Sequence, residues 1–173
     1  MAGQLSLLAR VERSERALFV RCVDHATLHQ SWRLGWTVLT HLGGTLSSIA
    51  IAGLPLLLAT GALRDAAGRA AATLLVSHLA VQLVKRTVNR RRPSMREATA
   101  SLVAEPDRFS FPSGHSAAAM AVAFAYAMAF PTLALPLLIV AVLVGMSRVF
   151  LGVHYPGDVV VGQAIAIVTA LLV

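Results

Sequence analysis

Two long stretches without a formally charged side chain constrain the fold of this chain most strongly. No Lys, Arg, Asp or Glu occurs between positions 34 and 63, and none occurs between positions 114 and 147. A helix needs about 20 apolar residues to cross a bilayer, so each stretch can hold at least one span. Because backbone polar groups inside a bilayer must be satisfied within the segment, spans of this kind are helical. The sequence therefore predicts an all-α, polytopic transmembrane bundle of five to six helices.

The composition supports a membrane protein and argues against a nucleic-acid-binding one. The chain is 57% hydrophobic and 13% charged, whereas soluble domains are about 25% charged. The net charge is +7, and all but one of the 15 basic residues are arginines. Arginine beside apolar spans indicates anchoring at the membrane surface and phosphate binding. The single Cys22 can form no intramolecular disulfide and belongs to no metal-binding pattern.

The length predicts one membrane-embedded domain over 1–173, with an N-terminal segment and five spans. Pro131 and Pro136 divide the second uncharged stretch into two helices. We expect the spans at about 43–63, 66–84, 114–130, 133–150 and 158–173. The last span ends at Val173 inside an apolar run, which leaves open whether the natural chain continues.

Residues 1–33 mix leucines with arginines and lack the compact apolar core of a signal peptide. This pattern predicts an amphipathic helix at the membrane interface. A helix packed on the bundle fits the pattern equally well. Within the segment, Asp24, His25 and His29 share a helical face. A histidine pair at this spacing can bind a metal, but further ligands are absent nearby and no metal is expected.

Polar residues gather where the predicted spans end. The basic stretch 85–93 follows the second span, and 113–115 opens the third. Residues 147–148 end the fourth span, and 154–158 open the fifth. Because successive spans alternate in direction, all four places lie on one face of the membrane. The sequence therefore predicts a single site there.

The residue types at this face suit a phosphoryl group. Lys85, Arg92 and Arg148 supply positive charge, and arginine can hold two oxygens at once. Ser113 is a natural N-cap, and Gly114 allows a ligand to approach the backbone. Free amides at a helix N-terminus favour an anion. Together these donors would surround a tetrahedral phosphate and stabilise its transition state.

Three further side chains can perform chemistry on that phosphate. Asp158 can hydrogen-bond one ring nitrogen of His154, which leaves the other nitrogen as a nucleophile. His115 can protonate the leaving oxygen and then activate water to hydrolyse the phosphohistidine. This scheme requires no cofactor and no metal.

His78 lies inside the second span, two turns before Lys85. A histidine within a span is a candidate functional residue. A hydrogen-bonded packing histidine is the simpler interpretation.

Each motif also has a simpler explanation. A basic run beside a span is usually a topology signal, a Pro-Ser-Gly sequence is usually a turn and cap, and a His–Asp pair is usually structural. Their joint occurrence at matching span ends favours a site. A non-catalytic protein that binds phosphate lipids is an alternative, but it would need no nucleophile with an orienting carboxylate. A phosphotransferase would differ only in the acceptor.

Three motifs resemble the signature of the type 2 phosphatidic acid phosphatase superfamily, which also includes vanadium haloperoxidases. They are Lys85-x6-Arg92-Pro93, Pro112-Ser113-Gly114-His115 and Ser147-Arg148-x5-His154-x3-Asp158. The resemblance covers about 40–173 and implies metal-independent hydrolysis of a phosphomonoester or diphosphate. It assigns His154 as nucleophile, Asp158 as its partner and His115 as general acid. It also assigns phosphate binding, in this chain, to Lys85, Arg92, Ser113, Gly114 and Arg148. Five spans are expected here, where six are common in the family.

The resemblance implies a phosphorylated membrane lipid as substrate. A polyprenyl diphosphate or a polyprenyl-phosphosugar phosphate is favoured, because the short chain is similar to bacterial polyprenyl-type members. Phosphatidic acid and phosphatidylglycerol phosphate are the alternatives. The excess of basic residues lies on the face of the site and of the N-terminus. By the positive-inside rule, we expect a multi-pass plasma-membrane protein whose site faces the cytoplasm. The sequence says nothing of the oligomeric state.

Overall fold

The computed structural model describes residues 2–28, 30–96, 101–105 and 107–173. Over these residues the chain is helical and contains no strand, apart from an isolated bridge between Arg91 and Phe109. The prediction of an all-α bundle is therefore confirmed. In chain order the elements are α1 (Ala2–Leu28), α2 (Gln30–His41), α3 (Thr45–Leu58), α4 (Ala62–Val88), α5 (Pro93–Arg96), α6 (Gly114–Ala129), the 3-10 turn η1 (Pro131–Leu133), α7 (Ala134–Phe150) and α8 (Pro156–Leu172).

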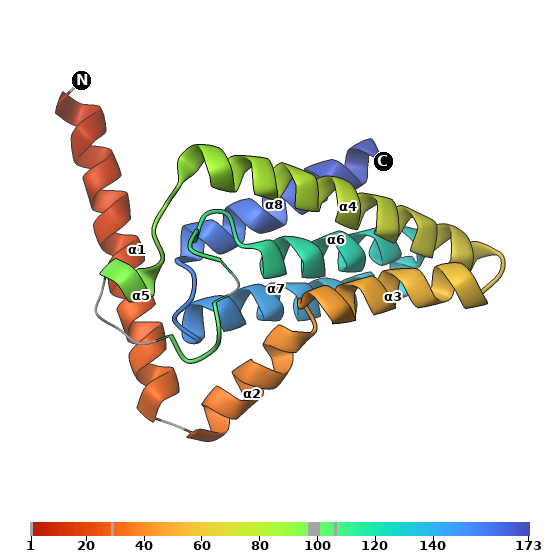
Figure 1. Ribbon diagram of the computed structural model, residues 1–173, viewed down its shortest axis with the longest axis horizontal. Coiled ribbons are helices and arrows are strands. Elements are labelled where there is room, and N and C mark those ends of the chain that lie inside the picture. Colours follow the sequence, from red (N-terminus) through yellow and green to blue (C-terminus); the bar gives the residue numbers. More distant parts are fainter. Residues whose placement is uncertain (1, 29, 97–100, 106) are drawn as a thin grey trace.

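Helix α6 lies at the centre of the bundle. Figure 1 shows α3, α4, α6, α7 and α8 running side by side, with α1 crossing one end of the bundle. Most of α6 is buried, and alanine dominates its sequence. Small side chains allow neighbouring helices to approach closely, and α6 packs against α4, α7 and α8. The Tyr126 hydroxyl adds a hydrogen bond to the Ile51 carbonyl of α3 at 2.9 Å.

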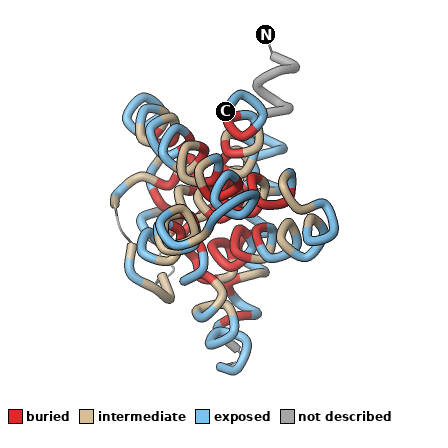
Figure 2. Tube along the Cα trace, turned by 90° about the vertical axis from the view of Figure 1, so that its right-hand side faces the viewer, coloured by how far each residue is buried: buried red, intermediate tan, exposed pale blue. Residues whose placement is uncertain are grey.

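The outside of the bundle is apolar. On α4, Leu75, Leu79 and Leu83 are each about three-fifths exposed, at 60%, 59% and 66%. Figure 2 shows that buried residues lie along the inner faces of the helices and exposed residues along the outer faces. A row of exposed leucines is unfavourable in water and is suited to contact with lipid.

Among the described residues two helices, or three if a bent pair counts as one span, are long and apolar enough to cross a bilayer. Helix α4 and the continuous helical stretch Pro131–Phe150 are long and apolar enough to cross a bilayer. Helices α2 and α3 meet that test together and are bent by 45° at the break between them. Helices α6 and α8 are apolar but have only 16 and 17 residues. At about 1.5 Å per residue they are roughly 25 Å long, against a hydrocarbon thickness of about 30 Å.

The N-terminal part of the chain differs from the predicted boundaries. The predicted segment 1–33 ends inside α2, because α1 already ends at Leu28 and α2 begins at Gln30. Helix α2 is tied to the bundle by Trp36, whose ring stacks on Phe150 with centroids 4.5 Å apart and an interplanar angle of 9°.

The connection between α3 and α4 also differs from the expectation. The predicted spans at about 43–63 and 66–84 leave Arg64 and Asp65 between them, but both residues lie in the first turn of α4. The chain reverses earlier, at Gly61, whose φ of +61° is a left-handed value that glycine adopts at little cost.

Candidate active site

Four helix ends meet at the end of the bundle that α1 crosses (Figure 1). They are the C-terminal ends of α4 and α7 and the N-terminal ends of α6 and α8. The structure brings all the predicted site residues to this end. The buried members are Lys85, Arg92, Ser113, Arg148, His154 and Asp158, and the partly exposed members are Gly114 and His115.

Asp158 is fixed by the start of α8. Its Oδ2 accepts a hydrogen bond from the Tyr155 amide at 2.8 Å, as part of a capping box. The same oxygen lies 3.6 Å from Nδ1 of His154. This separation is longer than a hydrogen bond, and such catalytic contacts often tighten when substrate binds. Nδ1 of His154 has no hydrogen-bond partner among the described residues, so the structure places Asp158 beside the ring but without the predicted hydrogen bond.

The contact with Arg92 defines the tautomer of His154. Arg92 is fully buried, and its Nη1 donates to the Val153 carbonyl at 3.0 Å. The same nitrogen lies 3.3 Å from Nε2 of His154. Because a guanidinium can only donate, Nε2 must present its lone pair. The ring proton then lies on Nδ1, which faces Asp158.

His154 is held neutral by its surroundings. Its pKa is lowered to about 4, chiefly by burial, with further lowering by Arg92 and Arg148 and an opposing effect of Asp158. A neutral imidazole with an unprotonated Nε2 has the form that a nucleophile needs, and attack through this nitrogen requires that Arg92 release its contact with the lone pair.

Arg148 carries donors that have no acceptor. Its Nη1 donates to the Thr40 hydroxyl of α2 at 2.5 Å. Its Nε and Nη2 are buried and have no hydrogen-bond partner among the described residues. A buried charged donor without a partner is costly. The arrangement becomes favourable when an anion binds there.

Asp107 lies between the other two cations. Its Oδ2 is 2.7 Å from Nζ of Lys85, and its Oδ1 is 3.0 Å from Nη2 of Arg92. Burial opposes ionisation, but Lys85 and Arg92 hold the pKa of Asp107 below its ordinary value. The carboxylate therefore occupies donors that a phosphoryl group could use.

The start of α6 completes the site. Ser113 is the N-cap, and its Oγ accepts from the Ser116 amide at 3.4 Å and hydroxyl at 2.8 Å. A Cβ at Gly162 would lie 2.5 Å from the Ser113 carbonyl oxygen, so only glycine lets α8 pass this close. A Cβ at Gly114 would meet nothing within 4 Å, which leaves its backbone open to a ligand.

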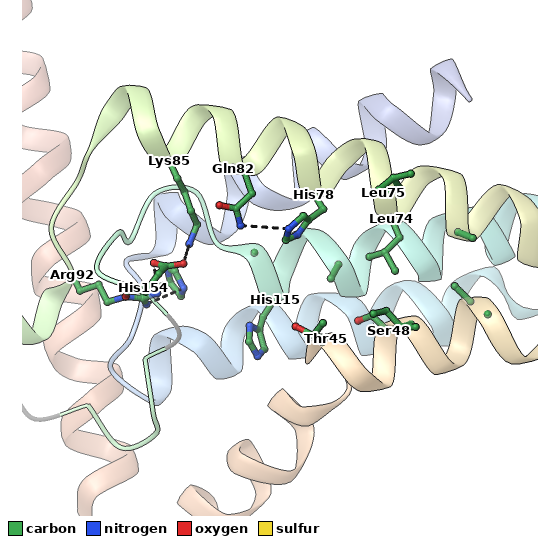
Figure 3. Close-up of a pocket in the computed structure, with 18 residues that line it drawn as sticks. Thr45, Ser48, Leu74, Leu75, His78, Gln82, Lys85, Arg92, His115 and His154 are labelled. Atoms are coloured by element: carbon green, nitrogen blue, oxygen red, sulfur yellow. Dashed lines mark hydrogen bonds and ion pairs between the residues drawn. The ribbon is translucent and has the colours of Figure 1, made fainter.

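One cavity joins the two histidines. It has a volume of about 610 Å³, and Gly114, His115 and His154 line it together with Lys85 and Arg92. Figure 3 shows His115 on α6 across the cavity from Lys85 and beside the start of α3. A group bound by Lys85 and Arg92 would therefore lie within the space that both histidines line.

Sequence reasoning missed a second layer of contacts around Asp158. Arg90 donates to its Oδ1 at 2.6 Å and to Glu15 of α1 at 2.8 Å. The other oxygen of Glu15 accepts from the Gly157 amide at 2.7 Å. Nothing in the basic run distinguishes Arg90 from its exposed neighbour Arg91, and no pattern marks Glu15.

The predicted cluster in α1 has no metal site among the described residues. His29 lies outside the described residues, and His25 packs edge-on against Trp32 with ring centroids 5.1 Å apart. In the part of the chain that the structure describes, no group of three or more His, Cys, Asp or Glu side chains could hold a metal ion.

Comparisons with known proteins identify related phosphatases. The family model of the PAP2 superfamily matches residues 66–173. A decaprenylphosphoryl-5-phosphoribose phosphatase of Mycobacterium tuberculosis is 39% identical over 104 residues, which cover 60% of this chain and 57% of that protein. A lipid A 1-phosphatase of Rhizobium johnstonii is 37% identical over 97 residues, which cover 53% of this chain and 40% of that protein.

A solved structure has the same arrangement of helices. It is the crystal structure of a transmembrane PAP2-type phosphatidylglycerolphosphate phosphatase from Bacillus subtilis. The TM-score is 0.73 and the identity 27%, over 94% of this chain and 84% of that one. The curated relatives match over a shorter stretch, and the chain spans less than two thirds of their length.

Proposed function

The chain belongs to the PAP2 superfamily, and from this premise we propose that it hydrolyses a lipid-linked phosphate through a phosphohistidine on His154. The observation that carries the proposal is the pair of unpartnered, buried donors on Arg148. The backbone carbonyl of Arg148 accepts a hydrogen bond from the His154 amide at 3.2 Å, and the charge of Arg148 contributes to the lowered pKa of His154. An anion-binding group beside a nucleophile is what phosphoryl transfer requires.

The proposed reaction has two balanced steps. His154 Nε2 forms a bond to phosphorus while the bond from phosphorus to the leaving oxygen breaks. His115, which must take up a proton when the phosphate offsets the surrounding positive charge, gives that proton to the leaving oxygen. Water then attacks phosphorus and gives a proton to His115, the N–P bond breaks, and inorganic phosphate leaves. Asp158 stabilises the positive charge that His154 carries in the intermediate.

The remaining predicted residues would bind the phosphoryl oxygens. Lys85, Arg92 and Arg148 balance the charge that develops on those oxygens in the transition state. The amide of Gly114, at the start of α6, adds a donor together with the positive end of the helix dipole. Ser113 would contribute indirectly: it is the N-cap of α6 and holds the start of the helix, and with it the Gly114 amide, in place.

For the substrate, we propose a polyprenyl diphosphate or a polyprenyl-phosphosugar phosphate. The mycobacterial relative is named for a decaprenyl-linked phosphoribose, and another relative is an undecaprenyl-diphosphatase of Bacillus subtilis. Phosphatidic acid or phosphatidylglycerol phosphate is the alternative, and a Bacillus subtilis phosphatidylglycerophosphatase B supports it. A non-catalytic lipid-binding role remains the contrasting hypothesis.

We propose that the site faces the cytoplasm at the plasma membrane. The basic stretch 85–96 lies at the end of the bundle that α1 crosses, while the opposite end has Arg64 and Arg69. The positive-inside rule supports this orientation. In a Cys22→Ser background, Ser94→Cys should resist an impermeant thiol reagent in intact cells, and Thr132→Cys should react. The reverse labelling would contradict this orientation.

Phosphate release by the purified protein tests the function. We expect release from a lipid phosphate in the presence of a chelator, and no release by His154→Ala. His25→Ala is the matched control, because His25 is an exposed histidine outside the cavity. A panel of polyprenyl diphosphate, polyprenyl phosphoribose phosphate, phosphatidic acid and phosphatidylglycerol phosphate ranks the substrates. Full activity in His154→Ala would refute the mechanism.

A further inference from the structure

The cavity extends beyond the catalytic residues along the groove between α3 and α4. Its lining passes from Lys85 and Arg92 at one end to Ile49, Ala52 and Leu74 at the other. Two polar side chains of α4, Gln82 and His78, lie between these ends (Figure 3). They precede Lys85 by three and seven residues, so they share its helical face. At about 1.5 Å per residue, they lie roughly 4.5 and 10.5 Å along the helix from it.

Gln82 and His78 face one another across one helical turn. Gln82 Nε2 and His78 Nε2 are 3.5 Å apart. Both lie on a helix whose neighbouring leucines are exposed to lipid. A polar pair on such a helix is unfavourable unless it contacts another polar group. The proposed hydrolysis at His154 assigns neither side chain a role.

Ser48 supplies an independent sign of a ligand. It lies on α3, lines the same cavity and is only 2% exposed. Its hydroxyl has no hydrogen-bond partner among the described residues. Other helical hydroxyls here, such as those of Ser77 and Thr87, donate to carbonyls of their own helix. An unpartnered buried hydroxyl is costly, and a polar ligand group in the groove would remove that cost.

The side chains of Ser48, Gln82 and His78 determine which chemical group this part of the cavity can bind. The three side chains offer donors from a hydroxyl, an amide and an imidazole. Among the described lining residues the one carboxylate is Asp107, and it pairs with Lys85 and Arg92. Neutral donors without a nearby free carboxylate suit a singly charged phosphate ester. The apolar lining beyond them suits a hydrocarbon chain.

We propose that His78, Gln82 and Ser48 form a second polar subsite, which binds a second phosphate lying between the hydrolysed phosphate and the lipid chain. This inference rests on the proposed function and narrows its substrate class. Two sources share this chemistry. A polyprenyl diphosphate places its second phosphate next to the first, near Gln82. A polyprenyl-phosphosugar phosphate interposes the sugar and places it farther along, near His78.

The test compares substrates with matched chains. We would measure kcat/KM on polyprenyl monophosphate, polyprenyl diphosphate and polyprenyl phosphoribose phosphate. In the double variant His78→Leu, Gln82→Leu, we compare kcat/KM for a two-phosphate substrate with kcat/KM for the monophosphate. This ratio of kcat/KM values should fall by about tenfold or more, as expected for lost hydrogen bonds to a charged group. A larger effect of Gln82→Leu alone indicates the diphosphate, and a larger effect of His78→Leu alone indicates the phosphosugar. Leu83→Ala, at an exposed position of the same helix, should leave the ratio unchanged.

A binding measurement separates this inference from the proposed function. In the His154→Ala background, the Kd ratio of diphosphate to monophosphate tests the subsite without turnover. Failure of the wild type to release phosphate from any lipid would overturn the hydrolase proposal alone. If the double variant leaves both the kcat/KM ratio and the Kd ratio between two-phosphate and monophosphate lipids unchanged, the second subsite alone would be overturned.

Discussion

Arg90 Nη1 lies 2.6 Å from Oδ1 of Asp158, although the two residues are 68 positions apart in the sequence. Through this contact the end of α4 helps to set the carboxylate that faces His154. Glu15 of α1 holds the other side of Arg90 and the Gly157 amide. The crossing helix therefore supports the His154–Asp158 pair from outside the bundle.

Removing Glu15 should therefore impair turnover. In Glu15→Ala, Arg90 and the Gly157 amide lose their shared acceptor, and Asp158 loses part of its fixed geometry. We expect kcat to fall about tenfold with little change in KM, because a small displacement of the reacting groups raises the activation barrier of the chemical step. Steady-state kinetics would show it, with Asp24→Ala, an exposed carboxylate on the same helix, as control. Unaltered kcat in Glu15→Ala would show that α1 plays no such part.

Arg148→Lys should weaken binding of a transition-state mimic. The guanidinium leaves Nε and Nη2 for an anion while Nη1 contacts Thr40. A lysine ammonium has its donors on one nitrogen and cannot present this planar fork of two nitrogens. We expect the inhibition constant for orthovanadate to rise about tenfold or more. Arg69→Lys, at the opposite end of α4, is the matched control. Equal inhibition of Arg148→Lys and wild type would place the anion elsewhere.

Asp107→Asn should have the opposite effect on anion binding. The Asp107 carboxylate pairs with Lys85 and Arg92, so an incoming phosphate must compete with it. Replacing the charge with an amide should lower the vanadate inhibition constant by several-fold. Asp65→Asn, in the first turn of α4, controls for a change in net charge. Weaker inhibition of Asp107→Asn would mean that the carboxylate orders the cations rather than competing for them.

The pH profile should reflect the depressed pKa of His154. Its pKa of about 4 lies below the ordinary value of 6.5, so the imidazole stays neutral as the pH falls from 6.5 towards 4. Activity that depends on its lone pair should be lost only as the pH falls through about 4. The acid limb of kcat/KM reports this group in the free enzyme, after correction for the separately measured ionisation of the substrate. If the acid limb of kcat/KM that belongs to His154 had its midpoint near pH 6.5, the buried, neutral form would be contradicted.

Much of the site was predictable because membrane helices alternate in direction. Once the span ends were located, Lys85, His115, Arg148 and His154 had to lie at one end of the bundle, and the structure places them there. The bend between α2 and α3 was not predicted, although Gly43 and Gly44 lie at the break, because glycines in an uncharged stretch are equally compatible with a continuous, closely packed helix.

The supporting contacts depend on tertiary geometry that no spacing encodes. Thr40 is an ordinary threonine in the sequence, yet it accepts a hydrogen bond from buried Arg148. Asp107 lies in a loop without a readable pattern, yet it bridges two cations. His78 was recognised as a candidate, but only the groove shared with Ser48 gave it a specific role.

The most direct measurement is to trap the phosphorylated protein. His115→Ala should slow hydrolysis of the intermediate, because water then lacks its base. After incubation with a lipid phosphate and chelator, alkaline denaturation preserves phosphohistidine, and peptide mass spectrometry locates the phosphate. The account predicts phosphate on His154 in His115→Ala and none when His154→Ala is added. Phosphate on another residue, or trapping that requires a divalent metal, would contradict it.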